Sequence, residues 1–164
     1  MKKIFPSLVS GFGAAVLTTI PLLKGFACCL LVPGAAIVAL FLDRKINHNL
    51  ERIKIQKALF FGFMTGLFAT FFITSFDLLL TYLTKSNDLF RDLDQTEALM
   101  RDWNFGPMLD ESIKMINHMA LEIETTGFST LYAVMIFFTY FISNSIFGML
   151  GGALGMAVLN KKTD

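Results

Sequence analysis

The chain has 164 residues, of which 54% are hydrophobic, 16% are charged and 18 are Phe. Ordinary soluble domains carry about 25% charged residues, so this composition excludes that class of protein. The net charge of +1, without a basic stripe interleaved with aromatic residues, argues against a nucleic-acid partner. The length fits one compact unit, which we interpret as a single membrane domain over residues 1–164.

Four apolar runs follow one another along the chain, at about 4–23, 26–42, 58–82 and 131–159, and nearly all charged residues lie between them. A helix crosses the ~30 Å hydrocarbon core of a bilayer with about 20 residues. The third and fourth runs exceed that length. The pattern therefore predicts an all-α fold: an integral membrane four-helix bundle with an extramembrane amphipathic helical insert between its third and fourth helices.

The first two runs are shorter and meet at a tight turn at Lys24-Gly25. Each approaches the lower limit of about 17 residues for a spanning helix. We expect a hairpin whose two helices both span the membrane, with a partly re-entrant hairpin as the alternative. Pro33 is expected to bend the second helix. Cys28 and Cys29 are too few for a zinc site, and we interpret them as small packing residues.

Basic residues are concentrated in the loop between the second and third runs, which contains Arg44, Lys45, Arg52, Lys54 and Lys57. Short basic loops remain on the cytoplasmic side of a membrane. The segment 85–126 instead has nine acidic and four basic residues, so it is the segment expected on the outside. The charge distribution therefore predicts a multi-pass membrane protein with cytoplasmic N- and C-termini.

The outer segment 85–126 has a helical periodicity of its own. Apolar residues recur at three-to-four spacing over 87–103 and again over 108–123. The sequence Asn-Phe-Gly-Pro at 104–107 separates the two stretches. We expect two amphipathic helices that lie at the membrane interface or cap the bundle.

Small residues form a ridge on each of the two long runs. They are Ala58, Gly62, Gly66 and Thr70 on the third run, and Gly148, Gly151, Gly152 and Gly155 on the fourth. Helices in lipid associate closely where small residues let their backbones approach. At 1.5 Å per residue, Gly62 and Gly66 lie ~8–14 Å in from Lys57, and Gly155 and Gly152 lie ~8–12 Å in from Asn160, so both pairs lie in the cytoplasmic half of the membrane. We therefore expect the two helices to pack at this depth, with Gly62 and Gly66 facing Gly152 and Gly155.

Two polar residues inside the apolar runs are candidates for a functional role. Asp77 is ionisable, and an ionisable residue within a membrane helix is a functional hypothesis by default. It lies ~30 Å along the helix from Lys57, so we expect an interfacial or capping role, with a proton- or cation-linked role as the alternative. Asn144 lies near the middle of the fourth run, where we expect a hydrogen bond to another helix.

Motifs for catalysis are absent from the sequence: it contains no phosphate loop, no paired-histidine motif and no Ser, His and Asp set that could form a triad. Met115, His118 and Met119 share one helical face, and their thioether and imidazole groups suit Cu(I). We interpret them instead as packing groups and one surface His. The sequence therefore predicts a protein that is not an enzyme and has no metal or other cofactor.

The order of these elements is similar to that of a known family. A short hairpin precedes a basic loop, the third run opens with Gln56-Lys57-Ala58-Leu59-Phe60-Phe61-Gly62, an outer helical insert follows, and a glycine-bearing last run stops at Lys161-Lys162. In these features the chain resembles a large family of uncharacterised bacterial four-span membrane proteins, grouped as a domain of unknown function. The resemblance implies a location in the bacterial inner (plasma) membrane and implies no activity.

The function that we predict from the sequence is that of a non-enzymatic structural, assembly or regulatory membrane component that acts through helix packing. Its surroundings would be the lipid bilayer, and its partner a second copy of the chain or another membrane protein. The alternative is a small transporter or channel subunit that works as an oligomer. A transporter should place polar residues on facing helices at the midplane, and the sequence offers little besides Asn144.

Overall fold

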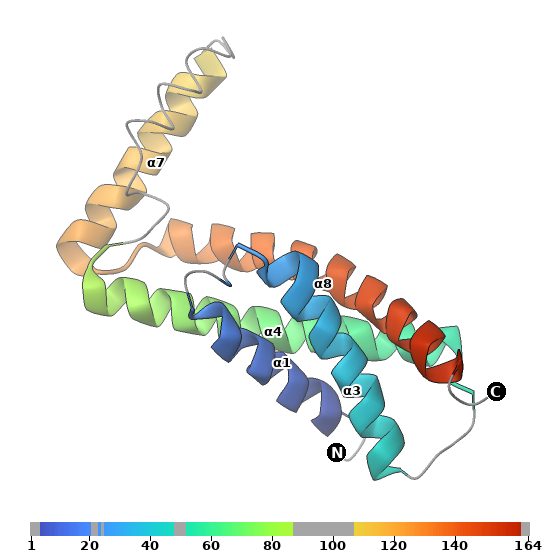
Figure 1. The fold of residues 1–164 in the computed structure, drawn as a ribbon. Helices are drawn as coiled ribbons and strands as arrows, with labels where there is room; N and C mark the ends of the chain where they lie inside the picture. The colour runs from blue at the N-terminus through green and yellow to red at the C-terminus, as the bar shows by residue number, and fades with distance from the viewer. Residues whose placement is uncertain (1–3, 21–22, 24, 48–51, 87–106, 162–164) are drawn as a thin grey trace. The chain divides into compact units, whose positions relative to one another are not determined.

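The computed structural model describes residues 4–20, 23, 25–47, 52–86 and 107–161. Within them the chain is helical and has no strand, so the all-α prediction is confirmed. The elements are α1 (Phe5–Thr18), the short π-helical segment η1 (Ala27–Leu31), α3 (Val32–Ile46), α4 (Ile55–Thr84), α7 (Pro107–Thr126) and α8 (Thr130–Lys161) (Figure 1). They fall into two units, one of Met1–Phe76 with Ile136–Asp164 (unit 1) and one of Asp77–Met135 (unit 2).

The helices α4 and α8 correspond to the third and fourth apolar runs. They have 30 and 32 residues, which gives lengths of about 45 and 48 Å at 1.5 Å per residue. Both are long and apolar enough to cross a membrane. Among the described residues, these are the two helices that meet this criterion.

The first helix is shorter than the predicted one over 4–23. The 14 residues of α1 rise only ~21 Å, which is less than the ~30 Å hydrocarbon core. At its end, the hydroxyl groups of Thr18 and Thr19 donate hydrogen bonds of 2.7 Å to the carbonyl oxygens of Ala15 and Val16. The sequence continues with Pro21, which disfavours helical geometry in the residue before it. These local effects stop α1 early.

The second apolar run forms a helix that changes pitch near its start. The π-helical η1 leads directly into α3, which has Pro33 in its first turn. Because Pro33 has no N–H to donate, the α-helical hydrogen-bond pattern cannot continue unbroken through it. The two segments have 5 and 15 residues and together rise roughly 30 Å. The helix also continues to Ile46, beyond the predicted end at Leu42.

In unit 2, the second half of the predicted outer insert is the amphipathic helix α7. It begins at Pro107, a favoured first residue because its missing N–H has no partner there. Its buried side chains include Met119 and Ile123, four residues apart on one face. Gly127, with a φ of 78°, follows the helix and donates its N–H to the carbonyl oxygen of Ile123 at 2.8 Å. The predicted helix over 87–103 lies outside the described residues.

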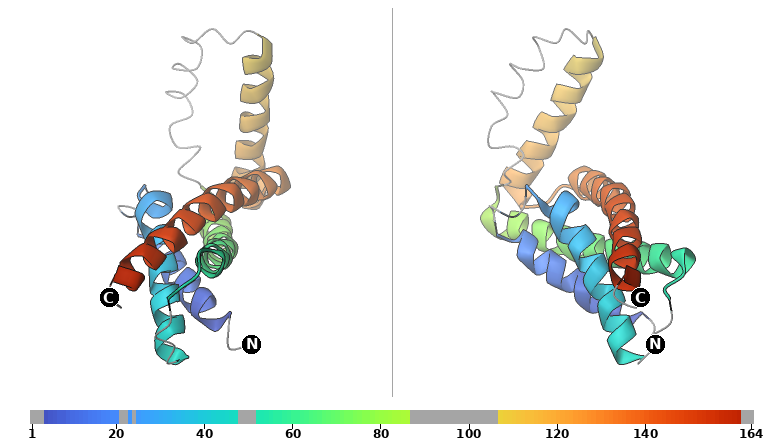
Figure 2. Two further views of the ribbon diagram at one scale, coloured as in Figure 1. Left: turned by 90° about the vertical axis from the view of Figure 1, so that its right-hand side faces the viewer. Right: turned by 45° about the vertical axis from the view of Figure 1, so that its right-hand side comes forward.

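The core of unit 1 lies between its helices in two clusters. One contains Ala39 and Leu40 of α3, Ile53, Ala58 and Phe61 of α4, and Leu159 of α8, with Ile53 just ahead of α4. The other contains Ala15 of α1, Val32 of α3, and Ala69 and Ile73 of α4. The helix α1 also packs along α3 (Figure 2). Within unit 1, each of the four helices therefore contributes side chains to a shared interior.

Candidate functional site

The backbones of α4 and α8 touch along a line of small residues in unit 1. A Cβ atom placed on Gly62 would lie 2.2 Å from the carbonyl oxygen of Gly148, and one on Gly152 would lie 2.2 Å from that of Ala58. Real Cβ atoms essentially never approach other atoms to less than 3.0 Å. Glycine is required here because any side chain would hold the two backbones apart. We call Ala58, Gly62, Gly66, Gly148 and Gly152 the small-residue seam.

The register of the seam differs by one helical turn from the predicted one. A Cβ atom on Gly66 would lie 2.2 Å from the carbonyl oxygen of Asn144, so Gly66 faces Asn144. Gly62 in turn lies between Gly148 and Gly152, since both approach it. The depth of the glycines along their helices predicted that these surfaces meet. It does not fix the register of the two helices to better than about one turn of 5.4 Å. The packing of small faces is observed, with this shift.

Gly155 does not face α4 as predicted but faces α3, together with Gly151. A Cβ atom on Gly151 would lie 2.3 Å from the Cα atom of Pro33, and one on Gly155 would lie 3.2 Å from the Cα atom of Ile37. Gly151 and Gly155 are one turn apart, and so are Gly148 and Gly152, on an adjacent face of the same helix. α8 therefore presents one pair of glycines to α4 and a second pair to α3.

Asn144 is completely buried at the end of the small-residue seam, with 0% of its surface exposed. Its side-chain amide donates a hydrogen bond of 3.1 Å to the hydroxyl oxygen of Thr70, which links α8 to α4. The Thr70 hydroxyl in turn lies 2.9 Å from the carbonyl oxygen of Gly66 and 3.1 Å from that of Tyr140, both acceptors for its proton. These polar groups are satisfied by one another within the interface.

Asp77 belongs to unit 2, where it is buried with 8% of its surface exposed. The hydroxyl of Tyr132, in the first turn of α8, donates a hydrogen bond of 2.6 Å to the Asp77 carboxylate. Tyr132 is also buried, and its backbone N–H lies 3.4 Å from the hydroxyl of Ser129, the residue before α8. Asp77 thus joins α4 to the first turn of α8.

Sequence reasoning missed a polar cluster in unit 1, where α3 ends, α4 begins and α8 ends. Its charged pair is Asp43, only 3% exposed, with Lys57 at 2.5 Å. The Asp43 side chain also accepts a hydrogen bond of 2.8 Å from the amide of Asn47. The Lys57 ammonium lies 5.6 Å from the centre of the Phe61 ring. A lone acid at the end of an apolar run, next to a basic loop, is the signal that could have indicated this pair.

Hydrogen bonds to the backbone complete this cluster. The side chain of Asn160 accepts the N–H of Ile53 at 2.9 Å and donates to the carbonyl oxygen of Ile53 at 3.1 Å. The guanidinium of Arg44 donates a bond of 2.8 Å to the carbonyl oxygen of Leu159, near the end of α8. Carbonyl groups in the last turn of a helix lack partners within it, so Arg44 acts as a cap from another helix. We call Asp43, Arg44, Ile53, Lys57, Leu159 and Asn160 the helix-end cluster.

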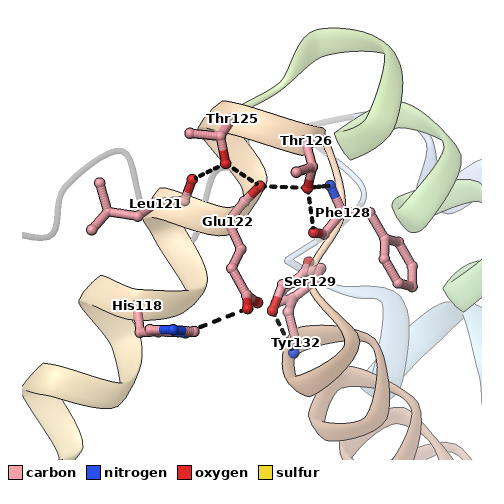
Figure 3. A network of polar contacts seen from close by, with 8 residues as sticks. All are labelled: His118, Leu121, Glu122, Thr125, Thr126, Phe128, Ser129 and Tyr132. Atoms are coloured by element: carbon pink, nitrogen blue, oxygen red, sulfur yellow. Dashed lines mark hydrogen bonds and ion pairs between the residues drawn. The ribbon is translucent and has the colours of Figure 1, made fainter.

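The turn between α7 and α8 in unit 2 is ordered by local hydrogen bonds (Figure 3). The hydroxyl of Thr126 donates to the carbonyl oxygens of Glu122 at 2.7 Å and Phe128 at 2.8 Å. His118 lies 3.5 Å from the carboxylate of Glu122, one turn along α7 (Figure 3). Of the three residues with copper-binding groups, Met119 is buried whereas Met115 and His118 are exposed.

Comparison of the chain with protein-family models, with curated proteins and with solved structures finds no match. The geometry of the two units is therefore the basis for assigning a function. Its main features are tight backbone packing at the small-residue seam, the buried hydrogen bonds of Asn144 with Thr70 and of Tyr132 with Asp77, and the helix-end cluster.

Proposed function

We propose that this protein is a multi-pass integral membrane protein, and that it acts as a non-enzymatic structural, assembly or regulatory component through helix packing. In this proposal α4 and α8 span the bilayer, and α1 with η1 and α3 forms the predicted hairpin of a four-helix membrane bundle. The basic loop 43–57 and both termini lie in the cytoplasm, and α7 lies outside. A bacterial inner membrane is the proposed location, in keeping with the family that the sequence resembles.

The observation that carries this proposal is the apolar surface that α8 leaves exposed. Large hydrophobic side chains are exposed at every fourth position along it, and Leu154, for example, is 58% exposed. The series is Phe138, Ile142, Ile146, Leu150, Leu154 and Val158. A soluble protein rarely exposes a continuous apolar patch of this extent, because its contact with water is unfavourable. Lipid chains would cover this face without that cost.

The small-residue seam favours a packing role over a transport pathway. Gly62 and Gly148 leave no room for even a methyl group between α4 and α8. Asn144 and Thr70, which lie at this interface, are hydrogen-bonded to each other, and Thr70 is also hydrogen-bonded to the backbone. A transport site needs polar groups that face a cavity or the substrate. The seam is instead suited to holding two helices in one fixed arrangement.

The proposal is tested by membrane extraction combined with a transport assay. The full chain should remain in the membrane fraction after washing with alkaline carbonate, because its long helices are held by the hydrophobic effect. Vesicles reconstituted with the purified protein should then show no more proton or potassium flux than empty vesicles. Release by carbonate would contradict the membrane assignment, and protein-dependent flux would favour the transporter alternative over the packing role.

A further inference from the structure

We propose that the helix-end cluster and the basic residues around it form a binding site for the headgroups of anionic phospholipids. This inference rests on the proposed membrane location and adds a specific lipid partner to it. The chemistry recognised is a phosphate group attached to apolar chains. The site lies in unit 1, where the end of α8 is beside the beginning of α4 (Figures 1 and 2).

The exposed charge at this place is entirely positive among the described residues 43–47, 52–57 and 160–161. They contain six basic residues and one acidic residue, Asp43. Asp43 is buried and paired with Lys57, so its negative charge does not reach the surface. The exposed basic side chains are Lys45, Arg52, Lys54, Lys57 and Lys161. The charge of Lys57 is compensated by Asp43, so an anion that approaches this surface meets chiefly the cations of Lys45, Lys54 and Lys161.

The hydrogen bonds of the cluster fix the relative positions of these cations. The two bonds between Asn160 and Ile53 join the end of α8 to the segment just before α4. The bond from Arg44 to the carbonyl oxygen of Leu159 joins α3 to the same end of α8. Lys45, Lys54 and Lys161 each lie within two residues of one of these bonded residues. They therefore belong to three separate parts of the chain whose backbones are held next to one another before any ligand binds.

The surroundings of the cations favour a lipid over a free phosphate ion or an acidic peptide. Lys57 immediately precedes the apolar run of α4, and Lys161 follows Leu159 by two residues. In the proposed orientation this is the depth of the phospholipid headgroups. Exposed apolar side chains flank the basic ones on all three helices, at Phe41, Ile46, Ile55 and Val158. A ligand with an anionic head and apolar chains matches both parts of this surface.

The experiment measures the melting temperature of the full chain in a neutral detergent with increasing phosphatidylglycerol or phosphatidylcholine of the same chain length. Phosphatidylglycerol should stabilise the wild-type protein at lower concentrations. The combined variant K45Q, K54Q and K161Q should need about a hundredfold more phosphatidylglycerol for the same stabilisation, because each lysine near an anionic lipid surface contributes about 1 kcal/mol to binding. The control K85Q with K114Q changes two exposed lysines of unit 2 and should behave like the wild type.

The results that would contradict the lipid site differ from the result that would contradict the membrane proposal. Equal effects of the two lipids, or an unchanged response of the triple variant, would overturn the lipid site. Equal stabilisation by inorganic phosphate and by phosphatidylglycerol would overturn the assignment to a lipid and indicate a phosphate site. Carbonate washing of the wild-type protein is measured in parallel. Release by carbonate would overturn both proposals, whereas retention without a phosphatidylglycerol preference would overturn the lipid site alone.

Discussion

Replacing Gly62 by alanine adds one methyl group at the closest approach of α4 and α8. The new Cβ atom would lie 2.2 Å from the carbonyl oxygen of Gly148 and 2.9 Å from the Cα atom of Met149. All its nearest neighbours are backbone atoms, so no flexible side chain can move aside. The helices would have to separate by roughly 1 Å to restore ordinary van der Waals distances. That separation would also weaken the neighbouring contacts of the seam.

The expected cost of this change has two parts. Overpacking of a well-packed interior destabilises a protein by about 1–3 kcal/mol. Replacing a glycine by alanine within a helix stabilises it by about 0.5–1 kcal/mol, because alanine loses less backbone entropy. The matched control is Gly13→Ala in α1, where a Cβ atom would meet nothing within 4 Å. Gly13→Ala gains the stabilisation of the helix by alanine without the cost of overpacking. The free energies of unfolding of the two variants should therefore differ by about 1–3 kcal/mol.

The assay is reversible unfolding in mixed micelles, with the free energy of unfolding measured for the wild type and both variants. Gly62→Ala should unfold more easily than Gly13→Ala by the stated difference. Equal free energies of unfolding for the two variants would show that α4 and α8 do not approach each other as described. The reasoning about the seam would then be wrong.

Three further predictions use the same measurement of unfolding. Asn144→Ala should lower the free energy of unfolding by about 1–2 kcal/mol, because its hydrogen bond to Thr70 is lost. The control Ser143→Ala should lower it less, and equal losses would contradict the role of that bond. Tyr132→Phe should cost about 1.5–3 kcal/mol, because a buried hydrogen bond to a carboxylate is lost, whereas the exposed Tyr82 tolerates the same change. Lys57→Met should lower the free energy of unfolding by about 1–3 kcal/mol, because it leaves the buried Asp43 carboxylate without its cation. The control Lys54→Met should be nearly neutral, and similar effects of the two changes would argue against the ion pair.

The two long helices could be predicted from the sequence because their signal is local. Apolar residues continue for more than 20 positions in each run, and the structure has helices of 30 and 32 residues there. The end of α1 was harder to predict, because apolar residues continue beyond Thr18. The helix stops through hydroxyl bonds to the backbone and through the proline that follows, which hydrophobicity does not report.

The contacts between helices could be predicted only in outline. Spacing by four identified Gly62, Gly66, Gly148 and Gly152 as packing residues, but two antiparallel helices can slide by a turn and still match small faces. Gly155 shares this spacing and yet faces α3, since adjacent faces of α8 both carry glycine. The position of Asp43 next to a basic loop could indicate an ion pair, but its pairing with Lys57 in particular depends on how α3 and α4 meet.

The most direct test of the membrane arrangement is the labelling of single cysteines by a membrane-impermeant thiol reagent. Cys28 and Cys29 are first replaced by alanine, and a cysteine is then introduced either at Ser112 in α7 or at Asn47 after α3. The account predicts that the cysteine at 112 reacts in intact cells and that the one at 47 reacts only after permeabilisation. Equal reaction at both sites in intact cells, or the reverse pattern, would contradict a membrane-spanning α4 in the proposed orientation.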